Sequence, residues 1–236
     1  MTYKLSDLQD DVTSGTVNCT YMDSNDRIWL CHGDSIVRYD TRAGTTDRID
    51  SPAPDDITAI TQTDSTNFFI GTSNGLLQTI EKEGVLETVA GTYTDSIRIP
   101  VSELYFHEDS KQLFIGTFKE GIIAYGMNTT STIIADGPLQ NVAIKRITPF
   151  GKRQLLVATG GRGVYKIDVD SLSARPYITA DYSNYNGMNG NNINDIYVDG
   201  DGRIWMANYP TGITIRNDRY RSYKWLKHSP CSSDLQ

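Results

Sequence analysis

The chain has 236 residues, of which 38% are hydrophobic, and a formal net charge of −7. A chain of this size can bury one substantial core, so we expect a single domain. The acidic balance argues against nucleic acid or an anionic membrane surface as the main partner, because both bind clustered Lys and Arg. No window approaches the roughly 18 consecutive apolar residues of a spanning helix, and residues 1–11 contain no apolar signal-peptide core. We therefore expect no membrane contact by this segment.

The first predicted elements are two short strands joined by a tight turn. Residues 17–22 and 27–31 alternate apolar and polar side chains, and Asp23–Asp26 supply residues that tolerate the positive φ of a hairpin turn. Thr, Ile, Val and Tyr are frequent in the rest of the chain and favour strands, and the 20 Gly favour turns between them.

Three cysteines are present, and none has the spacing of a zinc site. Cys19 and Cys31 fall on the two predicted strands, where we expect them to fill the core, and Cys231 lies near the end of the chain. The sequence predicts no metal and no cofactor.

The strand-turn-strand pattern recurs along the whole chain. Its five copies begin at Val17, Ile57, Val101, Ile144 and Ile193. Each copy has a bulky residue in its second strand: Trp29, Phe69, Phe114, Leu156 and Trp205. A third strand follows a glycine in four copies, at Gly75, Gly121, Gly163 and Gly212, whereas the first copy has Ser35 there, which predicts an altered turn. Fourth, outer strands are expected at 47–50, 84–89 and 221–226.

Four short strands in a repeat of about 45 residues are typical of a propeller blade. We predict an all-β fold, a single β-propeller of about five four-stranded blades over residues 1–236, in which the bulky residues fill the space between blades. The repeats are placed at about 17–56, 57–100, 101–143, 144–192 and 193–236. A sandwich or a β-solenoid is the alternative fold.

The copies resemble the two-component regulator propeller repeat, whose pattern is roughly V-x-x-I-x-x-D-x-x-G-x-I-W-I-G-T. The last copy is the most similar, and its matching residues are Ile193, Ile196, Asp199, Gly202, Ile204, Trp205 and Gly212. WD40 repeats fit less well because Trp29 and Trp205 are not followed by Asp, and kelch repeats because only Gly160 and Gly161 form a glycine pair.

This resemblance implies the periplasmic sensor region of an inner-membrane hybrid two-component histidine kinase of the Bacteroidetes type. Such regions detect oligosaccharides and pass the signal to kinase domains elsewhere in the protein, as homodimers. It also implies that this segment is not itself an enzyme and that it is an arc of a larger, seven-bladed propeller.

Candidate ligand-binding residues lie in the loops that meet on one face of a propeller. The connector 180–192 is the richest, because Tyr side chains stack on sugar rings and Asn amides donate to and accept from hydroxyls. The predicted ligand-binding residues are Tyr182, Tyr185, Asn186, Asn191, Asn208, Tyr209, His32, Lys119 and Arg162. The alternative is that these Asn residues serve loop geometry and that the cations are simply solvated.

Two other classes of function remain open, a propeller lyase or hydrolase resembling streptogramin lyases, and a protein-interaction scaffold. Glu103, Glu108 and Asp109 form the densest carboxylate group, but nothing in the sequence fixes a catalytic geometry. We expect His107 to be exposed at a strand end. Asp199–Arg203 resembles the start of a calcium loop but lacks its final Glu, so we expect a hairpin turn.

Overall fold

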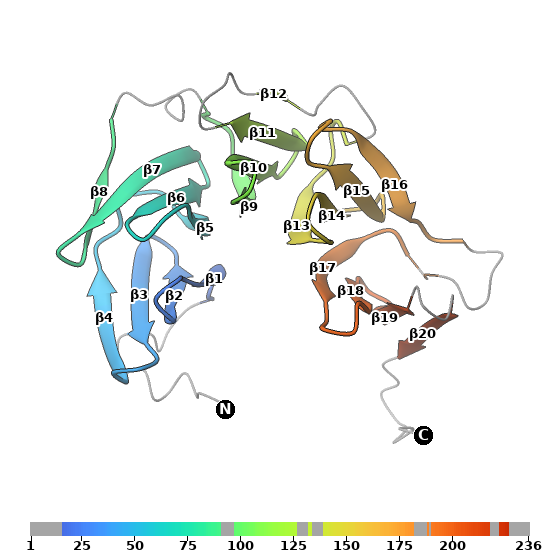
Figure 1. Cartoon of the computed structure of the whole chain (residues 1–236), viewed down its shortest axis with the longest axis horizontal. Helices are drawn as coiled ribbons and strands as arrows, with labels where there is room; N and C mark the ends of the chain where they lie inside the picture. The colour runs from blue at the N-terminus through green and yellow to red at the C-terminus, as the bar shows by residue number, and fades with distance from the viewer. Residues whose placement is uncertain are drawn as a thin grey trace. The chain divides into compact units, whose positions relative to one another are not determined.

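The computed structural model describes residues 16–90, 97–126, 132–133, 139–181, 188, 190–217 and 222–226. Within them lie twenty strands, which form five four-stranded sheets (Figure 1). In each sheet the strands lie side by side in chain order. The described residues contain no helix long and apolar enough to cross a membrane.

The chain divides into two compact units, with the boundary between Ile115 and Gly116. The first unit contains two whole sheets, β1 (Cys19–Met22), β2 (Arg27–His32), β3 (Ser35–Asp40) and β4 (Thr45–Ile49), then β5 (Ile57–Gln62), β6 (Asn67–Thr72), β7 (Gly75–Lys82) and β8 (Val85–Thr88). The third sheet comprises β9 (Val101–His107), β10 (Gln112–Thr117), β11 (Ile122–Gly126) and β12 (Thr132–Ile133), and the boundary falls within β10.

The second unit contains the last two sheets. They are β13 (Ile144–Pro149), β14 (Gln154–Thr159), β15 (Val164–Asp168) and β16 (Ala174–Ile178), then β17 (Ile193–Val198), β18 (Ile204–Asn208), β19 (Gly212–Asn217) and β20 (Ser222–Leu226). The outer strands β4, β8 and β20 lie within one or two residues of their predicted ranges.

In the first unit, the first two sheets pack face to face through their largest side chains. Trp29 of β2 is fully buried and its ring centroid lies 4.8 Å from that of Phe68 in β6. Both belong to one core cluster that also contains Ile36 and Ile70. Because β6 is covered on both faces, consecutive residues Phe68 and Phe69 are both buried instead of alternating.

The other bulky repeat residues occupy the equivalent place in β6, β10, β14 and β18. Leu156 packs in a cluster with Ile193 and Met206 of the neighbouring fifth sheet, and Phe114 is fully buried. Gly71 lies on the same face of β6 as Phe69, and a Cβ there would come within 2.5 Å of Val101, so this face packs against β9. Trp205 is only half-buried.

Glycines lie at or just before the start of third strands, and the backbone leading to the next sheet passes close to Gly75, Gly121 and Gly163. At Gly121 and Gly163, with φ of 82° and 77°, a Cβ would lie 2.4 Å from the carbonyl oxygens of Leu139 and Ile178. In the first sheet, the turn between β2 and β3 differs, as the serine at position 35 predicted. Its residue with positive φ is Gly33.

A side-chain hydrogen bond links the inner strands of neighbouring sheets in the first unit. Thr58 lies in a β-bulge of β5, and its Oγ1 donates to the Val101 carbonyl of β9 at 2.6 Å. At the equivalent position, Asn18 Nδ2 donates to the Ile57 carbonyl at 3.2 Å. The first and second sheets therefore each hold the first residue of the next sheet through that residue's backbone.

Candidate ligand-binding site

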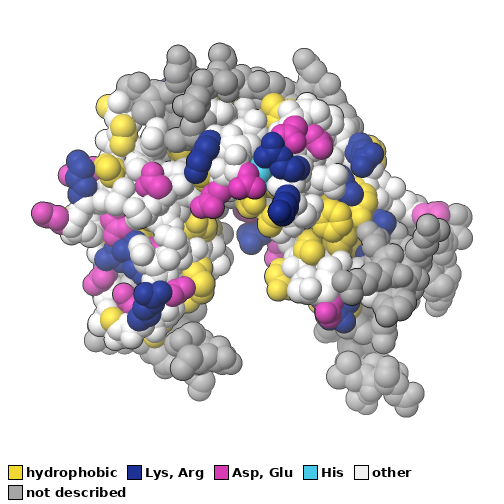
Figure 2. Space-filling model, viewed as in Figure 1, with side chains coloured by type: hydrophobic (Ala, Val, Ile, Leu, Met, Phe, Trp, Pro, Cys, Tyr) yellow, Lys and Arg dark blue, Asp and Glu magenta, His cyan; other side chains and the backbone are white. Residues whose placement is uncertain are grey.

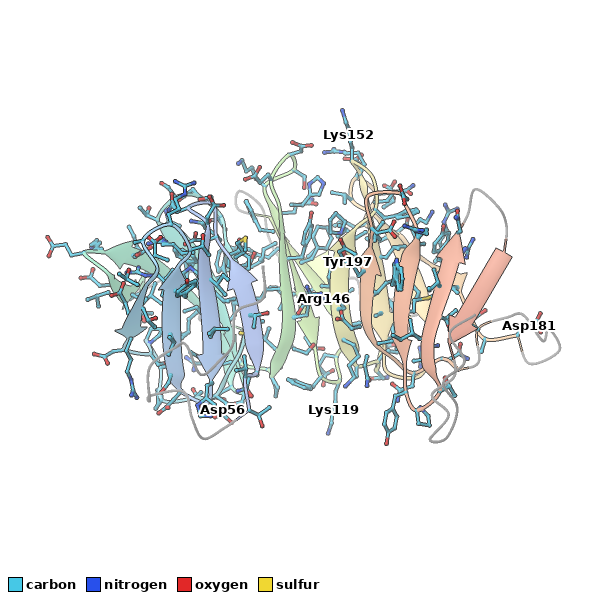
Figure 3. The ribbon with its side chains drawn as sticks, turned by 90° about the horizontal axis from the view of Figure 1, so that it is seen from below. Asp56, Lys119, Arg146, Lys152, Asp181 and Tyr197 are labelled. Carbon is cyan, nitrogen blue, oxygen red and sulfur yellow. The ribbon has the colours of Figure 1, made fainter. Side chains whose placement is uncertain are left out.

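In the second unit, the turns between second and third strands meet the connectors between sheets at one end of the strands. We call this region the loop end; it comprises residues 117–121, 139–143, 159–163, 188, 190–192 and 208–212. Gly160 bridges Asn192, and Tyr209 N donates to the Asn192 carbonyl at 2.9 Å. Lys119 extends from this end of the strands, and Lys152 of the β13–β14 turn extends from the opposite end (Figure 3).

Asn208 replaces a threonine of the other repeats at the loop end. Thr117 and Thr159 occupy the same place, at the end of the second strand, and each Oγ1 donates to the carbonyl of the glycine that precedes the third strand, at 2.8 Å and 2.7 Å. Asn208 has a longer side chain and instead donates from Nδ2 to the Gly190 carbonyl at 3.2 Å. This bond leaves Asn208 Oδ1 as an acceptor.

Within the part of the chain that the structure describes, two polar atoms beside Gly190 are buried without a hydrogen-bond partner. Asn208 is 5% exposed and its Oδ1 is unpartnered, as is Oγ1 of Thr211 in the β18–β19 turn. A Cβ on Gly190 would lie 3.8 Å from Thr211 Oγ1, so both side chains border the same glycine. An unpartnered acceptor and hydroxyl would be satisfied by a small group that both donates and accepts, such as a water molecule or an alcohol.

Tyr209 lies between these two residues in the sequence and is 62% exposed. Its exposed ring offers an apolar face at the loop end, while its backbone N–H is already bonded to Asn192. The loop end thus combines a buried acceptor with an exposed aromatic side chain, the two features that a polyhydroxylated ligand uses.

Asn191 lies in the same place but holds the loops together. Its Oδ1 accepts from Ala180 N at 2.7 Å, and its carbonyl accepts from Gly161 N and Gly163 N at 3.1 Å and 2.7 Å. The structure therefore gives this predicted ligand-binding residue a structural role.

Of the six remaining predicted residues, three lie at other turns and three lie outside the described residues. Lys119 and Arg162 are exposed on the other turns of the loop end, and Arg162 N donates to Thr159 Oγ1. His32 lies in the first unit, at the end of β2. Tyr182, Tyr185 and Asn186 lie outside the described residues.

Sequence reasoning missed a cavity of about 440 Å³ in the first unit. Asp34, Ser35, Arg48 and Asp50 line it together with the connector 51–54. Arg48 Nη2 donates to Ser35 Oγ at 3.3 Å. The sequence signal for this cavity was the charged residues that flank the proline-containing connector. Figure 2 shows acidic and basic side chains interspersed over the first unit.

His107 is buried, so the expectation that it would be exposed was wrong. It is 6% exposed, and Nδ1 accepts from Ser110 N at 3.2 Å, which leaves the proton of a neutral ring on Nε2. The neighbouring Glu108 and Asp109 are exposed. Burial, and then the negative charges of these two carboxylates, raise the pKa of Tyr105. The hydrogen bond between His107 and Ser110 stabilises the β9–β10 turn.

Asp199 organises a hairpin turn, as expected. Its Oδ1 accepts from Asp201 N and Arg203 N, at 3.0 Å and 2.9 Å, and its Oδ2 accepts from Arg203 Nε and Trp205 Nε1, at 2.7 Å and 2.9 Å. The hydrogen bond from Trp205, followed by those from Arg203, holds the pKa of this carboxyl well below its usual range. Across the described part of the chain, no three His, Cys, Asp or Glu residues are grouped as metal ligands.

The comparisons with known proteins agree with the repeat pattern. Residues 187–209 match the family described as two component regulator propeller. The chain is similar to a structure of the extracellular domain of the putative one component system BT4673 from B. thetaiotaomicron, with a TM-score of 0.66 and 22% identity over 85% of this chain and 27% of that chain. A second structure of that domain, described as belonging to a putative hybrid two component system, gives a TM-score of 0.65 and 21% identity over 83% and 26%.

A third similar structure is virginiamycin B lyase from Staphylococcus aureus, with a TM-score of 0.67 and 14% identity over 92% of this chain and 71% of that chain. No curated protein sequence matches the chain.

These likenesses confirm the predicted fold. The chain is an all-β protein with the β-propeller fold, and the sequence of residues 187–209 is similar to a two-component regulator propeller repeat. It spans about a quarter of the length of the BT4673 domains.

Proposed function

We propose that this chain is the ligand-sensing segment of an extracytoplasmic two-component sensor and that it binds an oligosaccharide or a related polyol at the loop end of its second unit. The observation that carries the proposal is the unpartnered, buried Oδ1 of Asn208, which borders Gly190 as Thr211 does, next in sequence to the exposed Tyr209. The match of residues 187–209 to a regulator repeat supports the sensing role.

The chemistry favours a ligand rich in hydroxyl groups. A hydroxyl donates to Asn208 Oδ1 and exchanges a hydrogen bond with Thr211 Oγ1, whereas a carboxylate or phosphate meets an acceptor and is disfavoured. An unsatisfied buried acceptor costs about 1–3 kcal/mol, so a ligand that supplies the donor gains affinity at this position. Stacking of an apolar sugar face on Tyr209 adds to it.

Signalling requires more than this segment. Binding shifts a sensor between two arrangements only by the difference in affinity for them. We propose that the segment belongs to an inner-membrane hybrid histidine kinase that is a homodimer and faces the periplasm. The remaining domains of that kinase would respond to the shift. Further blades would complete the propeller to seven.

The test is ligand binding by the chain and by Asn208→Thr. A glycan panel identifies a ligand, and calorimetry then measures its affinity. Thr is the residue of three other repeats at this position, so the variant keeps the fold but loses the buried acceptor. We expect affinity to fall about tenfold, since one hydrogen bond contributes about 0.5–1.5 kcal/mol. Thr117→Ser is the matched control, which leaves the loop-end acceptor intact. Unchanged affinity in Asn208→Thr contradicts the site.

The second candidate is a propeller lyase, which the likeness to virginiamycin B lyase supports at the level of fold. Incubation of the chain with virginiamycin B and with the bound glycan, followed by mass spectrometry, separates the two. Linearised or cleaved product at catalytic rates favours the lyase, and unchanged ligand favours the sensor. Saturable capture of a protein with no glycan binding would instead favour an interaction scaffold.

A further inference from the structure

Cys19 and Cys31 lie directly opposite each other on neighbouring strands. The β1–β2 register pairs Cys19 with Cys31, and the intervening Tyr21–Trp29 and Met22–Ile28 pairs show no register shift. Both cysteines carry free thiols in the structure. Since directly paired side chains point to the same face of a sheet, the two thiols share the face that packs on the second sheet. Cys31 is fully buried in that core cluster, and Cys19 packs against it.

The hydrogen-bond phase of the hairpin sets the distance between the two residues. Asp23 N donates to the Arg27 carbonyl at 3.0 Å, which makes this a hydrogen-bonded pair, and the phase repeats at every second pair toward Cys19 and Cys31. Beyond this pair, Asn18 N also donates to the Cys31 carbonyl at 2.8 Å, as in a β-bulge where the regular pairing ends. Cα atoms of such pairs are typically about 5.5 Å apart, within the range of about 4.4–6.8 Å that a disulfide bridges.

The side chains must approach slightly for the bond to form. Cβ atoms of paired residues are about 4.5–5.5 Å apart, with hydrogen-bonded pairs at the wider end, whereas a disulfide needs about 3.5–4.5 Å. A cross-strand bond here is consequently strained and more readily reduced than an unstrained one.

The buried position decides when the bond forms. Contact with the Cys31 thiol, and then burial, raise the pKa of Cys19, so the reactive thiolate is scarce in the folded protein. Cys31 is also inaccessible once the first two sheets have packed. Oxidation therefore takes place while the hairpin is formed but not yet covered.

We infer that Cys19 and Cys31 form a cross-strand disulfide when the chain folds in the presence of a disulfide oxidant. The two thiols together lose two protons and two electrons as the S–S bond forms, and the oxidant disulfide is reduced to two thiols. Extracytoplasmic compartments supply such oxidants. The inference concerns the first unit and does not depend on the ligand site proposed in the second.

The test is oxidative refolding of the full chain carrying Cys231→Ser, in a mixture of oxidised and reduced glutathione. Free thiols are then blocked under denaturing conditions and the protein is digested with chymotrypsin without reductant. Cleavage after Tyr21 and Trp29 separates the two cysteines, so a joined peptide pair that reductant releases identifies the disulfide. We expect that joined pair as the main product, and slow oxidation when the reduced, already folded chain receives the same mixture.

Complete blocking of both thiols after oxidative refolding overturns the inference, as does mixed pairing with Cys231 in the unsubstituted chain. The variant Cys19→Ala with Cys231→Ser is the control. It must leave Cys31 as a thiol or a glutathione adduct, and any cross-linked peptide in it would show that the assignment is wrong. Expression with export to the periplasm, followed by the same digest, provides a second measurement that needs no refolding.

Discussion

The indole Nε1 of Trp29 donates a hydrogen bond to Oδ2 of Asp23 at 2.8 Å, across the turn between β1 and β2. Asp23 also accepts from Arg27, whose Nε lies 2.6 Å from the same oxygen. The fifth sheet has the same arrangement of Asp199, Arg203 and Trp205. In both sheets, the carboxylate joins the turn to the bulky residue of the second strand.

The first prediction concerns the acid stability that Asp23 provides. Burial alone would raise its pKa, but hydrogen bonds from Trp29 and from Arg27 outweigh burial and lower it. The folded state therefore favours the charged carboxylate, and its contribution is full above the unfolded pKa of about 3.9 and declines as the pH falls through the lower folded value. We expect Asp23→Asn to flatten the loss of unfolding free energy between about pH 5 and pH 2, measured by urea denaturation. An unchanged slope would contradict this.

The second prediction separates packing from hydrogen bonding at Trp29. Since this side chain is fully buried, Trp29→Ala should lower the free energy of unfolding by about 3–5 kcal/mol. Trp29→Phe keeps most of the volume but removes the N–H group, and we expect a smaller loss of about 1–3 kcal/mol. Chemical denaturation of both variants measures the difference, and equal losses would refute a specific role for the Asp23 bond.

The third prediction uses two glycines with nearly the same backbone angle. Gly121 has φ of 82° and Gly151 has φ of 78°, so Ala introduces similar backbone strain of about 1 kcal/mol at each. The Cβ at residue 121 would also lie 2.4 Å from the Leu139 carbonyl, whereas Gly151 has nothing within 4 Å. We expect Gly121→Ala to lower the melting temperature clearly more than Gly151→Ala, in parallel thermal melts. Equal shifts would mean that the Leu139 connector moves away freely.

The fourth prediction concerns a buried ion cluster between the first two sheets. Glu81 of β7 accepts from Arg27 Nη1 and Nη2 at 2.9 Å and 2.7 Å and also from Arg38, and these side chains are only 11–15% exposed. Glu81→Gln removes the charge that both guanidinium groups share, while Arg27 keeps Asp23 and Arg38 keeps Asp47, so we expect a loss of about 1–3 kcal/mol that salt changes little.

The exposed Arg42–Asp26 pair provides the control for Glu81. Asp26→Asn should have little effect in the same unfolding assay, since exposed ion pairs contribute little and are screened by salt. A Glu81→Gln effect as small as that of the control would contradict the importance of burial.

The sequence predicts the sheets better than the site, for a physical reason. A repeated pattern places Trp29 and Leu156 at the same depth in their sheets, because every copy must bury the same face. The environment of Asn208 depends instead on Gly190, which lies 18 residues away and contacts it only once the connector has folded over the strand end. Likewise, Asn191 has the composition of a ligand residue, but its hydrogen-bond partners are fixed by tertiary structure.

The hydrogen bonds from Asn18 and Thr58 reach backbone oxygens of Ile57 and Val101, not side chains. Every amino acid carries that oxygen, so the link makes no demand on the residue type that receives it. A gene duplication or an inserted unit would keep the connection without a compensating mutation, and propellers of this kind can thereby gain units during evolution while their sequences diverge.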